Sequence, residues 1–209
     1  MITITDILEC EQYLSDVQAV IFDMDDTLYS EKDYVYSGYQ AVAAEFPQVA
    51  NMAQKLWYAF EKRQPAIDVV LAAEGLNTPE HKTIALTAYR THQPQISLYT
   101  GVYDLLRRLK KSKKLGLITD GRPDGQRAKL RALGIESLFE RIIITDELGS
   151  TEYRKPNETA FRLMSQVLEL PFGSMVYIGD NIKKDFAAPE NLGMRTIWFS
   201  NPEGLYNAP

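Results

Sequence analysis

The sequence is poor in the residues that stabilise secreted proteins or bind soft metals. It has one cysteine, Cys10, and two histidines among 209 residues, so an internal disulfide cannot form. A single cysteine is typical of proteins in a reducing compartment, and we expect a cytoplasmic protein. Cys10 lies alone in a polar N-terminal stretch, and we expect it to have no catalytic role.

Long hydrophobic runs and an excess of basic charge are also missing. No stretch stays apolar over the ~18 residues that a membrane-spanning helix needs. Residues 1–16 lack the basic region and apolar run of a signal peptide. The formal net charge is −5, which gives no general attraction to nucleic acid or to an anionic membrane. We therefore expect a soluble globular protein that binds neither a membrane nor a nucleic acid polymer; its oligomeric state stays open.

Short apolar runs, each bounded by turn-forming residues, predict buried β-strands. They are continuous, not alternating, and rich in β-branched or aromatic residues, as in strands buried on both faces of a parallel sheet. Helical periodicity follows at residues 101–111, 125–134 and 156–170. This alternation predicts an α/β fold with a doubly wound, Rossmann-like parallel sheet. The predicted strands are residues 19–22, 115–119, 141–145, 175–179 and 195–199.

Residues 31–96 break the alternation of strands and helices. They contain helical patterns separated by proline and glycine, and no convincing strand. We predict an inserted all-helical domain at 31–96 and an α/β core domain formed by 1–30 and 97–209. Two linkers, near residues 29–32 and 94–97, predict a hinge between the domains. The helical patterns lie at 34–46, 51–63, 66–75 and 79–90.

Aspartates follow four of the predicted strands: Asp23, Asp120, Asp146 and Asp180. In open parallel sheets, ligands bind just beyond the carboxyl ends of the strands. A single aspartate at such a place usually stabilises a turn, and nothing adjacent to Asp120 or Asp146 indicates more. Asp26 is likewise expected to stabilise its own turn.

Asp23 and Asp180 have further acidic neighbours. Asp25 is two residues after Asp23, so both side chains can face the same side of an extended chain. Asp185 follows Asp180 by about one helical turn. Clustered carboxylates need a compensating cation, and Mg²⁺ takes one or two carboxylates together with waters and a substrate phosphate. We expect Asp23, Asp180 and the backbone carbonyl of Asp25 to bind Mg²⁺. Asp185 would hold these ligands in place.

Two further positions suit a phosphate group. Thr119 ends a predicted strand and offers its hydroxyl, and the turn at Asp120 and Gly121 offers N–H groups. Lys155 precedes Pro156, where we predict that a helix begins, and its ammonium can neutralise charge on a transferring phosphoryl group. Each signal alone is weak. Together, however, the Asp23–Asp25 pair, Thr119, Lys155 and the Asp180–Asp185 pair all fall at strand-to-helix junctions.

These segments resemble the four motifs of the haloacid dehalogenase superfamily, in the usual order. The segments are DMDDTL (23–28), LITDG (117–121), RKP (154–156) and GDNIKKD (179–185). The helical segment after the first strand is similar to the cap domain of that superfamily, and the resemblance covers residues 17–200. It implies a Mg²⁺-dependent hydrolase with a Rossmann-like core and a helical cap.

The resemblance also implies a role for each motif residue. Asp23 would attack phosphorus and form an aspartyl-phosphate, and Asp25 would act as general acid and then general base. Thr119 and Lys155 would hold the phosphoryl oxygens. Members that cleave carbon–halogen bonds need no acid at the position of Asp25, so we expect a phosphatase and not a dehalogenase.

The substrate is less well defined by the sequence. We expect a small phosphomonoester, either a sugar phosphate or a nucleoside monophosphate, contacted by Tyr29, Arg122 and Arg63. The aromatic residues of 31–96 are expected to form the core of the inserted helices. A phosphomutase of the β-phosphoglucomutase type stays open as an alternative. A phosphoreceiver module is disfavoured, because it needs neither a second acid nor a helical insertion.

Overall fold

The structure is a computed structural model and describes residues 1–206. The chain separates into two compact units. The first, which we call the core unit, comprises residues 1–31 and the chain from residue 97 onward; the second, the cap unit, comprises residues 32–96.

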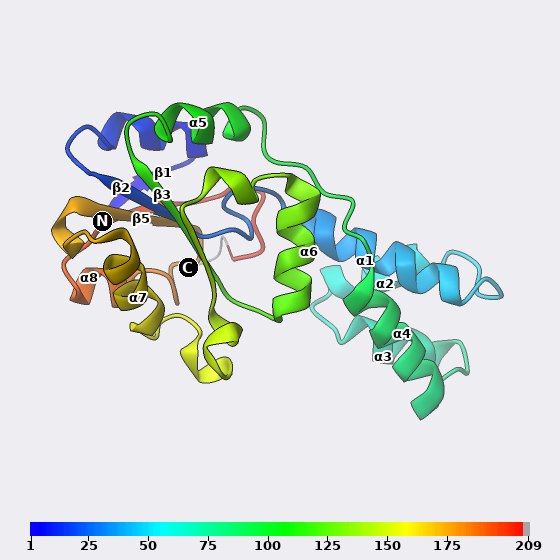
Figure 1. Cartoon of the computed structure of the whole chain (residues 1–209). Helices are drawn as coiled ribbons and strands as arrows, with labels where there is room; N and C mark the ends of the chain where they lie inside the picture. Colours follow the sequence, from blue (N-terminus) through cyan, green and yellow to red (C-terminus); the bar gives the residue numbers. More distant parts are fainter. Residues whose placement is uncertain (207–209) are drawn as a thin grey trace. The chain divides into compact units, whose positions relative to one another are not determined.

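The core unit contains a six-stranded sheet with the order β1-β6-β5-β2-β3-β4, in which every neighbouring pair is parallel (Figure 1). The five strands predicted from apolar runs are confirmed. The additional edge strand, β1, is only three residues long and was not predicted, because a short partly exposed segment carries no apolar run. The strands are β1 (Ile2–Ile4), β2 (Ala19–Phe22), β3 (Lys114–Thr119), β4 (Arg141–Ile144), β5 (Met175–Gly179) and β6 (Arg195–Phe199).

Strand β2 lies at the centre of the sheet, between β5 and β3. Ala19 is paired with Met175 on one side and Lys114 on the other, so the three strands run in step. The ladder continues beyond β2, since the N–H of Asp23 donates to the carbonyl of Ile178 at 2.8 Å. The residues that follow β2, β5 and β3 therefore meet at one edge of the sheet.

Helices cover both faces of the sheet: Figure 1 shows α5 on one side and α7 and α8 on the other. The apolar side chains of α5 recur at helical spacing, and Leu105 and Leu106 are fully buried. Helix α7 begins at Thr159, three residues after the predicted start at Pro156, because the side chain of Asn157 accepts a hydrogen bond from the Thr159 N–H at 2.8 Å. The helices are α5 (Val102–Leu109), α6 (Pro123–Leu133), α7 (Thr159–Leu168) and α8 (Ala187–Asn191).

The cap unit consists of helices around a separate hydrophobic cluster. Val42, Leu56 and Ala85 are fully buried in it, and Tyr39 is nearly so. Trp57 packs at its margin, so much of the aromatic content supports this small core. The helices are α1 (Glu31–Glu45), α2 (Met52–Glu61), α3 (Ala66–Ala73) and α4 (Pro79–Thr91).

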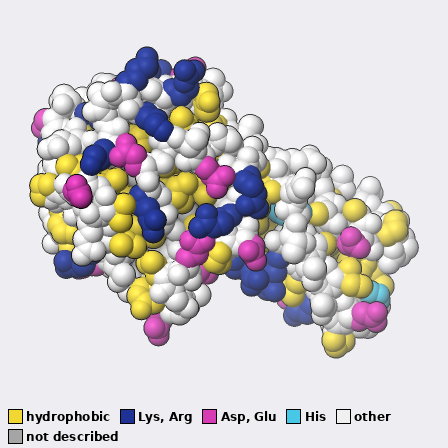
Figure 2. All heavy atoms as spheres, in the orientation of Figure 1, with side chains coloured by type: hydrophobic (Ala, Val, Ile, Leu, Met, Phe, Trp, Pro, Cys, Tyr) yellow, Lys and Arg dark blue, Asp and Glu magenta, His cyan; other side chains and the backbone are white. Residues whose placement is uncertain are grey.

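Basic side chains gather around the C-terminal end of α5, as Figure 2 shows at the top of the view. Arg107 and Arg108 lie in its last turn, where they complement the partial negative charge of the helix end. Lys113 and Lys114 bind backbone carbonyls of Val17 and Leu168 at 2.8 and 2.7 Å. These residues lie before or at the start of β3, away from the edge where the acidic residues meet.

The single cysteine lies in the interior of the core unit. Cys10 is fully buried, and burial, together with Glu11 and Asp6, raises the pKa of its thiol to about 12. A protonated buried thiol is not a nucleophile, as expected for this residue.

Within residues 1–206, every helix is too short or too polar to cross a bilayer.

The substitution Phe161→Ala tests the packing of α7 on the sheet. Phe161 is fully buried, with its ring edge-on to Tyr177 at a centroid distance of 5.0 Å. We expect a loss of about 3–5 kcal/mol in the free energy of unfolding, measured by urea titration. Val167→Ala on the same helix, where the side chain is exposed, should cost less than about 0.5 kcal/mol. Equal losses in the two variants would contradict this packing.

Candidate active site

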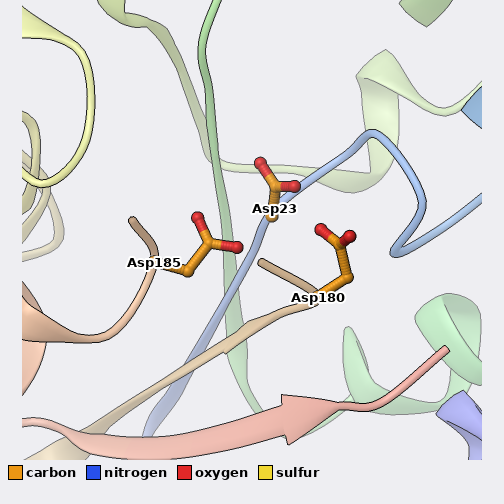
Figure 3. A group of neighbouring side chains, drawn as sticks. All are labelled: Asp23, Asp180 and Asp185. Atoms are coloured by element: carbon orange, nitrogen blue, oxygen red, sulfur yellow. The ribbon is translucent and has the colours of Figure 1, made fainter. Parts of the chain in front are cut away.

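Three buried carboxyl groups meet where β2 and β5 end. Oxygens of Asp23, Asp180 and Asp185 lie within 4.8 Å of one another, and Figure 3 shows the three groups turned toward a common space. The pairing of β2 with β5 brings Asp23 beside Asp180. Asp185 is folded back by a turn, in which its N–H donates to the carbonyl of Asn181 at 3.0 Å. The sequence motifs one and four therefore converge, as predicted.

Glycine is required at the end of β5 for this convergence. A Cβ added at Gly179 would lie 2.6 Å from Oδ2 of Asp185, closer than nonbonded atoms approach. The same oxygen accepts a hydrogen bond from the N–H of Asn181 at 2.9 Å. The absence of a side chain at position 179 thus allows Asp185 to pack behind Asp180.

Lys155 brings a positive charge into the cluster. Its ammonium lies 2.5 Å from Oδ1 of Asp23 and 2.8 Å from Oδ1 of Asp185, and it donates to the hydroxyl of Tyr177 at 2.9 Å. Burial lowers the pKa of Lys155, but Asp185 and Asp23 outweigh this and hold it well above the ordinary value. Lys155 is therefore positively charged at neutral pH.

One ammonium does not neutralise three carboxylates. Burial, followed by the charges of Asp23 and Asp185, raises the pKa of Asp180 to about 9. Burial also raises the pKa of Asp23 to about 7, against the attraction of Lys155. Among the described residues, the Asp180 carboxyl has no hydrogen-bond or ion-pair partner. A hard divalent cation with oxygen ligands fits this set of donors.

Asp185 is engaged on both of its oxygens. Oδ1 faces Lys155 and lies 3.3 Å from the hydroxyl of Tyr177, while Oδ2 accepts from Asn181. Asp23 and Asp180 are less constrained, so they are the better direct ligands and Asp185 the better support.

Asp25 lies in a different environment from Asp23. Oδ1 accepts hydrogen bonds from Lys129 at 2.7 Å and from the hydroxyl of Tyr29, and Oδ2 accepts from Gln126 at 2.9 Å. Burial raises the pKa of Asp25, but the charge of Lys129 and these hydrogen bonds outweigh it and lower the pKa below its ordinary value. Asp25 is thus a carboxylate fixed in one orientation.

The place of Tyr29 differs from the prediction of a substrate contact. Its side chain is fully buried and its hydroxyl is used on Asp25. Tyr29 therefore orients Asp25 from behind. The sequence placed Tyr29 next to motif one but carried no information on which way its ring turns.

The residues of motif two are brought to the same edge. Thr119 is buried and its hydroxyl accepts from Gln126 at 2.5 Å, so Gln126 links it to Asp25. The carboxylate of Asp120 accepts hydrogen bonds from the backbone N–H of Lys155 and from the ammonium of Lys184, both at 3.1 Å. Asp120 therefore holds both lysines in position. Gly121 has φ +131°, which favours glycine, and the side chain of Arg122 is exposed at the start of α6.

A pocket of about 200 Å³ opens over the cluster, lined entirely by residues of the core unit. Arg154 forms a double hydrogen bond with Asp146 at 2.7 Å on both nitrogens. Burial, then the charge of Asp25, raises the pKa of Glu31 to about 8. The lining residues are Asp23, Asp25, Glu31, Asp120, Arg154, Asp180, Lys184 and Tyr206.

Several residues of the site were missed by sequence reasoning. Gln126 and Lys129 are three residues apart on α6, which places them on one face of the helix. This polar pair beside the apolar face is the sequence pattern that could have indicated their role in the site. Lys184 lies inside motif four. No local pattern marks Glu31 or Tyr206.

Asp26 stabilises its turn and also joins distant segments. It is fully buried with φ +50°, and its carboxylate accepts from the N–H of Glu31 at 2.8 Å and from that of Leu205 at 2.7 Å. Its carbonyl accepts from the side chain of Asn201 at 2.7 Å. The C-terminal segment 201–206 is thereby bound to motif one.

Comparisons with known proteins agree with this arrangement. Residues 20–199 match the haloacid dehalogenase-like hydrolase family. A glyceraldehyde 3-phosphate phosphatase from Methanocaldococcus jannaschii is 28% identical over 87% of this chain and 84% of its own length. The 5-amino-6-(5-phospho-D-ribitylamino)uracil phosphatase YigB from Escherichia coli is 23% identical over 91% and 87%, respectively.

A solved structure with a similar fold is the HAD-hydrolase YfnB from Bacillus subtilis, bound to magnesium. Its TM-score is 0.67 at 19% identity, with 89% of this chain and 88% of that one covered. In this chain the core has six parallel strands, five of them predicted from the sequence, and the helices α1–α4 are inserted after β2. The chain belongs to the haloacid dehalogenase-like hydrolases, and within them it is a phosphatase.

Proposed function

We propose that this phosphatase depends on Mg²⁺ and hydrolyses the phosphate ester of a small hydroxylated metabolite through an aspartyl-phosphate on Asp23. The observation that carries the proposal is the buried cluster of Asp23, Asp180 and Asp185 around a single ammonium group. The cluster is short of positive charge, and it lies at the base of a pocket.

Asp23 acts as the nucleophile. One of its oxygens is held by Lys155 at 2.5 Å, which orients the carboxylate and favours its ionised form. The other oxygen attacks phosphorus, a new O–P bond forms, and the bond from phosphorus to the alcohol oxygen breaks with its electron pair leaving on that oxygen. Lys155 also offsets charge on the phosphoryl oxygens as they move.

Asp25 moves the protons of the reaction. A phosphate dianion beside Asp25 adds negative charge that raises the pKa of this carboxyl, so substrate binding favours the protonated acid that the leaving alcohol needs. After the alcohol leaves, Lys129 and Gln126 stabilise the carboxylate, which then takes a proton from the attacking water. Water attack releases phosphate and restores Asp23.

Mg²⁺ bound by Asp23, Asp180 and the backbone carbonyl of Asp25 would offset the repulsion between these carboxylates and the substrate phosphate. Asp185 and Tyr177 keep Lys155 in place. Thr119 lies at the same edge and is the candidate to hold a phosphoryl oxygen.

A sugar phosphate is the substrate class that we favour. The M. jannaschii relative is a glyceraldehyde 3-phosphate phosphatase by name, and its similarity extends over most of both chains. The match to the pyrimidine 5'-nucleotidase YjjG of E. coli covers only 50% of this chain. The pocket of about 200 Å³ is small beside the roughly 300–1,000 Å³ of typical ligand sites, which favours a short alcohol half.

The nucleophile is tested with Asp23→Asn. We expect the release of phosphate from glyceraldehyde 3-phosphate in the presence of Mg²⁺ to fall by at least about 1,000-fold, because the amide cannot attack phosphorus. Asp104→Asn, a surface change on α5, should leave the rate unaltered. Substantial activity in a folded Asp23→Asn protein would reject the mechanism, and an isomeric phosphate without release of free phosphate would indicate a mutase.

The role of Asp25 is tested with Asp25→Asn and 4-nitrophenyl phosphate. Nitrophenolate leaves without a proton, so the first step survives, whereas the attacking water lacks its base. We expect a rapid release of about one nitrophenolate per enzyme, followed by turnover slowed by roughly 100-fold or more. Steady-state loss without this burst would argue against Asp25 as the base.

The cation site is tested by thermal unfolding at two pH values. Because the pKa of Asp180 is raised in the folded protein, this group contributes to the free energy of unfolding as long as it stays protonated. The contribution is fully present below its ordinary pKa of 3.8 and is lost as the pH rises toward about 9. With EDTA, the Tm should therefore fall between pH 6 and pH 8. Added Mg²⁺ must displace the proton, so its stabilising effect should be larger at pH 8, with apparent affinity changing by up to roughly tenfold per pH unit.

Asp180→Asn serves as the matched control for the cation experiment, because it keeps the shape of the side chain and removes its charge. Both the fall in Tm with pH and the pH-dependent effect of Mg²⁺ should weaken in this variant. An effect of Mg²⁺ that is equal at both pH values in the unaltered protein would contradict displacement of a proton from this cluster.

A further inference from the structure

Most polar groups that line the pocket already have protein partners. Lys184 is paired with Asp120 at 3.1 Å, and Arg154 with Asp146 at 2.7 Å. Asp25 accepts hydrogen bonds on both oxygens. These groups shape the phosphate end of the pocket and have limited capacity to bind the rest of a substrate.

Two of the groups that line the pocket are not bound by other described residues. Among residues 1–206, the Glu31 carboxyl and the Tyr206 hydroxyl have no hydrogen-bond or ion-pair partner. The Glu31 carboxyl is the largest influence on the pKa of the Tyr206 phenol, which it raises, so the two groups lie close enough to interact. Both belong to the core unit and both line the pocket.

A shared anchor holds these two residues at the pocket. The carboxylate of Asp26 binds the N–H of Glu31 on one oxygen and the N–H of Leu205, the neighbour of Tyr206, on the other. Asn201 adds a hydrogen bond to the Asp26 carbonyl and another to the hydroxyl of Tyr99 at 2.8 Å. Asp26 therefore fixes both the start of α1 and the C-terminal segment.

We propose that Glu31 and Tyr206 bind hydroxyl groups of the alcohol half of the substrate, and so select phosphate esters whose alcohol half is small, uncharged and hydroxylated. The proposal rests on the phosphatase function above and names what determines its specificity. A carboxyl group and a phenol are both good partners for hydroxyls, and a carboxyl group remains so whether or not it is protonated.

Charge favours an uncharged alcohol half. The lining contains five carboxyl groups, Asp23, Asp25, Glu31, Asp120 and Asp180, and its two cationic side chains are already paired. The pKa values of Asp25 and Asp120 are lowered, so these two groups are negatively charged at neutral pH. A second anionic group on the substrate would therefore meet repulsion that a hydroxyl does not meet.

The experiment compares two substrates in each variant. Glyceraldehyde 3-phosphate offers a hydroxyl group, whereas phenyl phosphate offers none, and the readout is the ratio of their kcat/KM values with Mg²⁺. In Glu31→Ala the ratio should fall about tenfold, and in Tyr206→Phe about fivefold, since each loses a hydrogen bond to the hydroxylated substrate.

Matched variants separate this role from damage to the fold. Glu31→Gln keeps a hydrogen-bonding side chain and should restore the ratio to within about threefold of the unaltered enzyme. Tyr103 on α5 is exposed to a similar degree as Tyr206, with exposed fractions of 46% and 47% for the two residues. Tyr103→Phe therefore removes a comparable hydroxyl group and should not change the ratio. The unaltered enzyme should also prefer glyceraldehyde 3-phosphate to 3-phosphoglycerate, which differs by a carboxylate, by about tenfold or more.

The outcomes distinguish this inference from the function on which it rests. Equal losses for both substrates in Glu31→Ala, or an equal rate on 3-phosphoglycerate, would overturn the inference while leaving a working phosphatase. An unaltered enzyme that hydrolyses neither phenyl phosphate nor glyceraldehyde 3-phosphate with Mg²⁺ would overturn the proposed function itself.

Discussion

The buried ion pairs of Lys155 with Asp23 and Asp185 are the interactions on which the rest of the site depends. Desolvated carboxylates are costly, and they persist here because an ammonium group on a separate segment is held against them. Lys155 is in turn positioned by Asp120, which accepts its N–H, and by Tyr177 from β5. The compensation is incomplete, because Asp180 has a raised pKa and no partner in the described part of the chain. This remaining imbalance is what makes the cluster suited to a divalent cation and a phosphate.

Two aspartates separated by one residue are given opposite chemical properties by their surroundings. Burial, together with the neighbouring carboxyl group of Asp185, raises the pKa of Asp23, whereas Lys129, Gln126 and Tyr29 outweigh burial and lower the pKa of Asp25. Pairs of acids whose environments separate their pKa values can divide a reaction between them. In the proposed mechanism, Asp23 attacks phosphorus and Asp25 moves the protons. The helix α6 supplies two of the three groups that make this difference, so it contributes directly to the proposed chemistry as well as covering the sheet.

The pocket is completed by segments that are remote in sequence. Asp26 binds the residue at the start of α1 and the C-terminal segment through one carboxylate, which places Glu31 and Tyr206 at the pocket. All the residues that line this pocket belong to the core unit. In the proposed function, the acidic lining would bind the cation and would repel a second anionic group on the substrate.

Sequence patterns alone predicted five of the six strands, the helices α5–α7 between them, the inserted helices α1–α4 and the four motifs. They could do so because hydrophobic periodicity is a local property and because parallel strands end at one edge, where Asp23, Thr119 and Asp180 were expected to meet. Three features could be seen only in the folded chain: Lys129 holds Asp25, Tyr29 turns inward, and the C-terminal segment reaches the pocket. Those features depend on long-range packing and on single hydrogen bonds between segments far apart in the chain, which leave no repeating pattern along it.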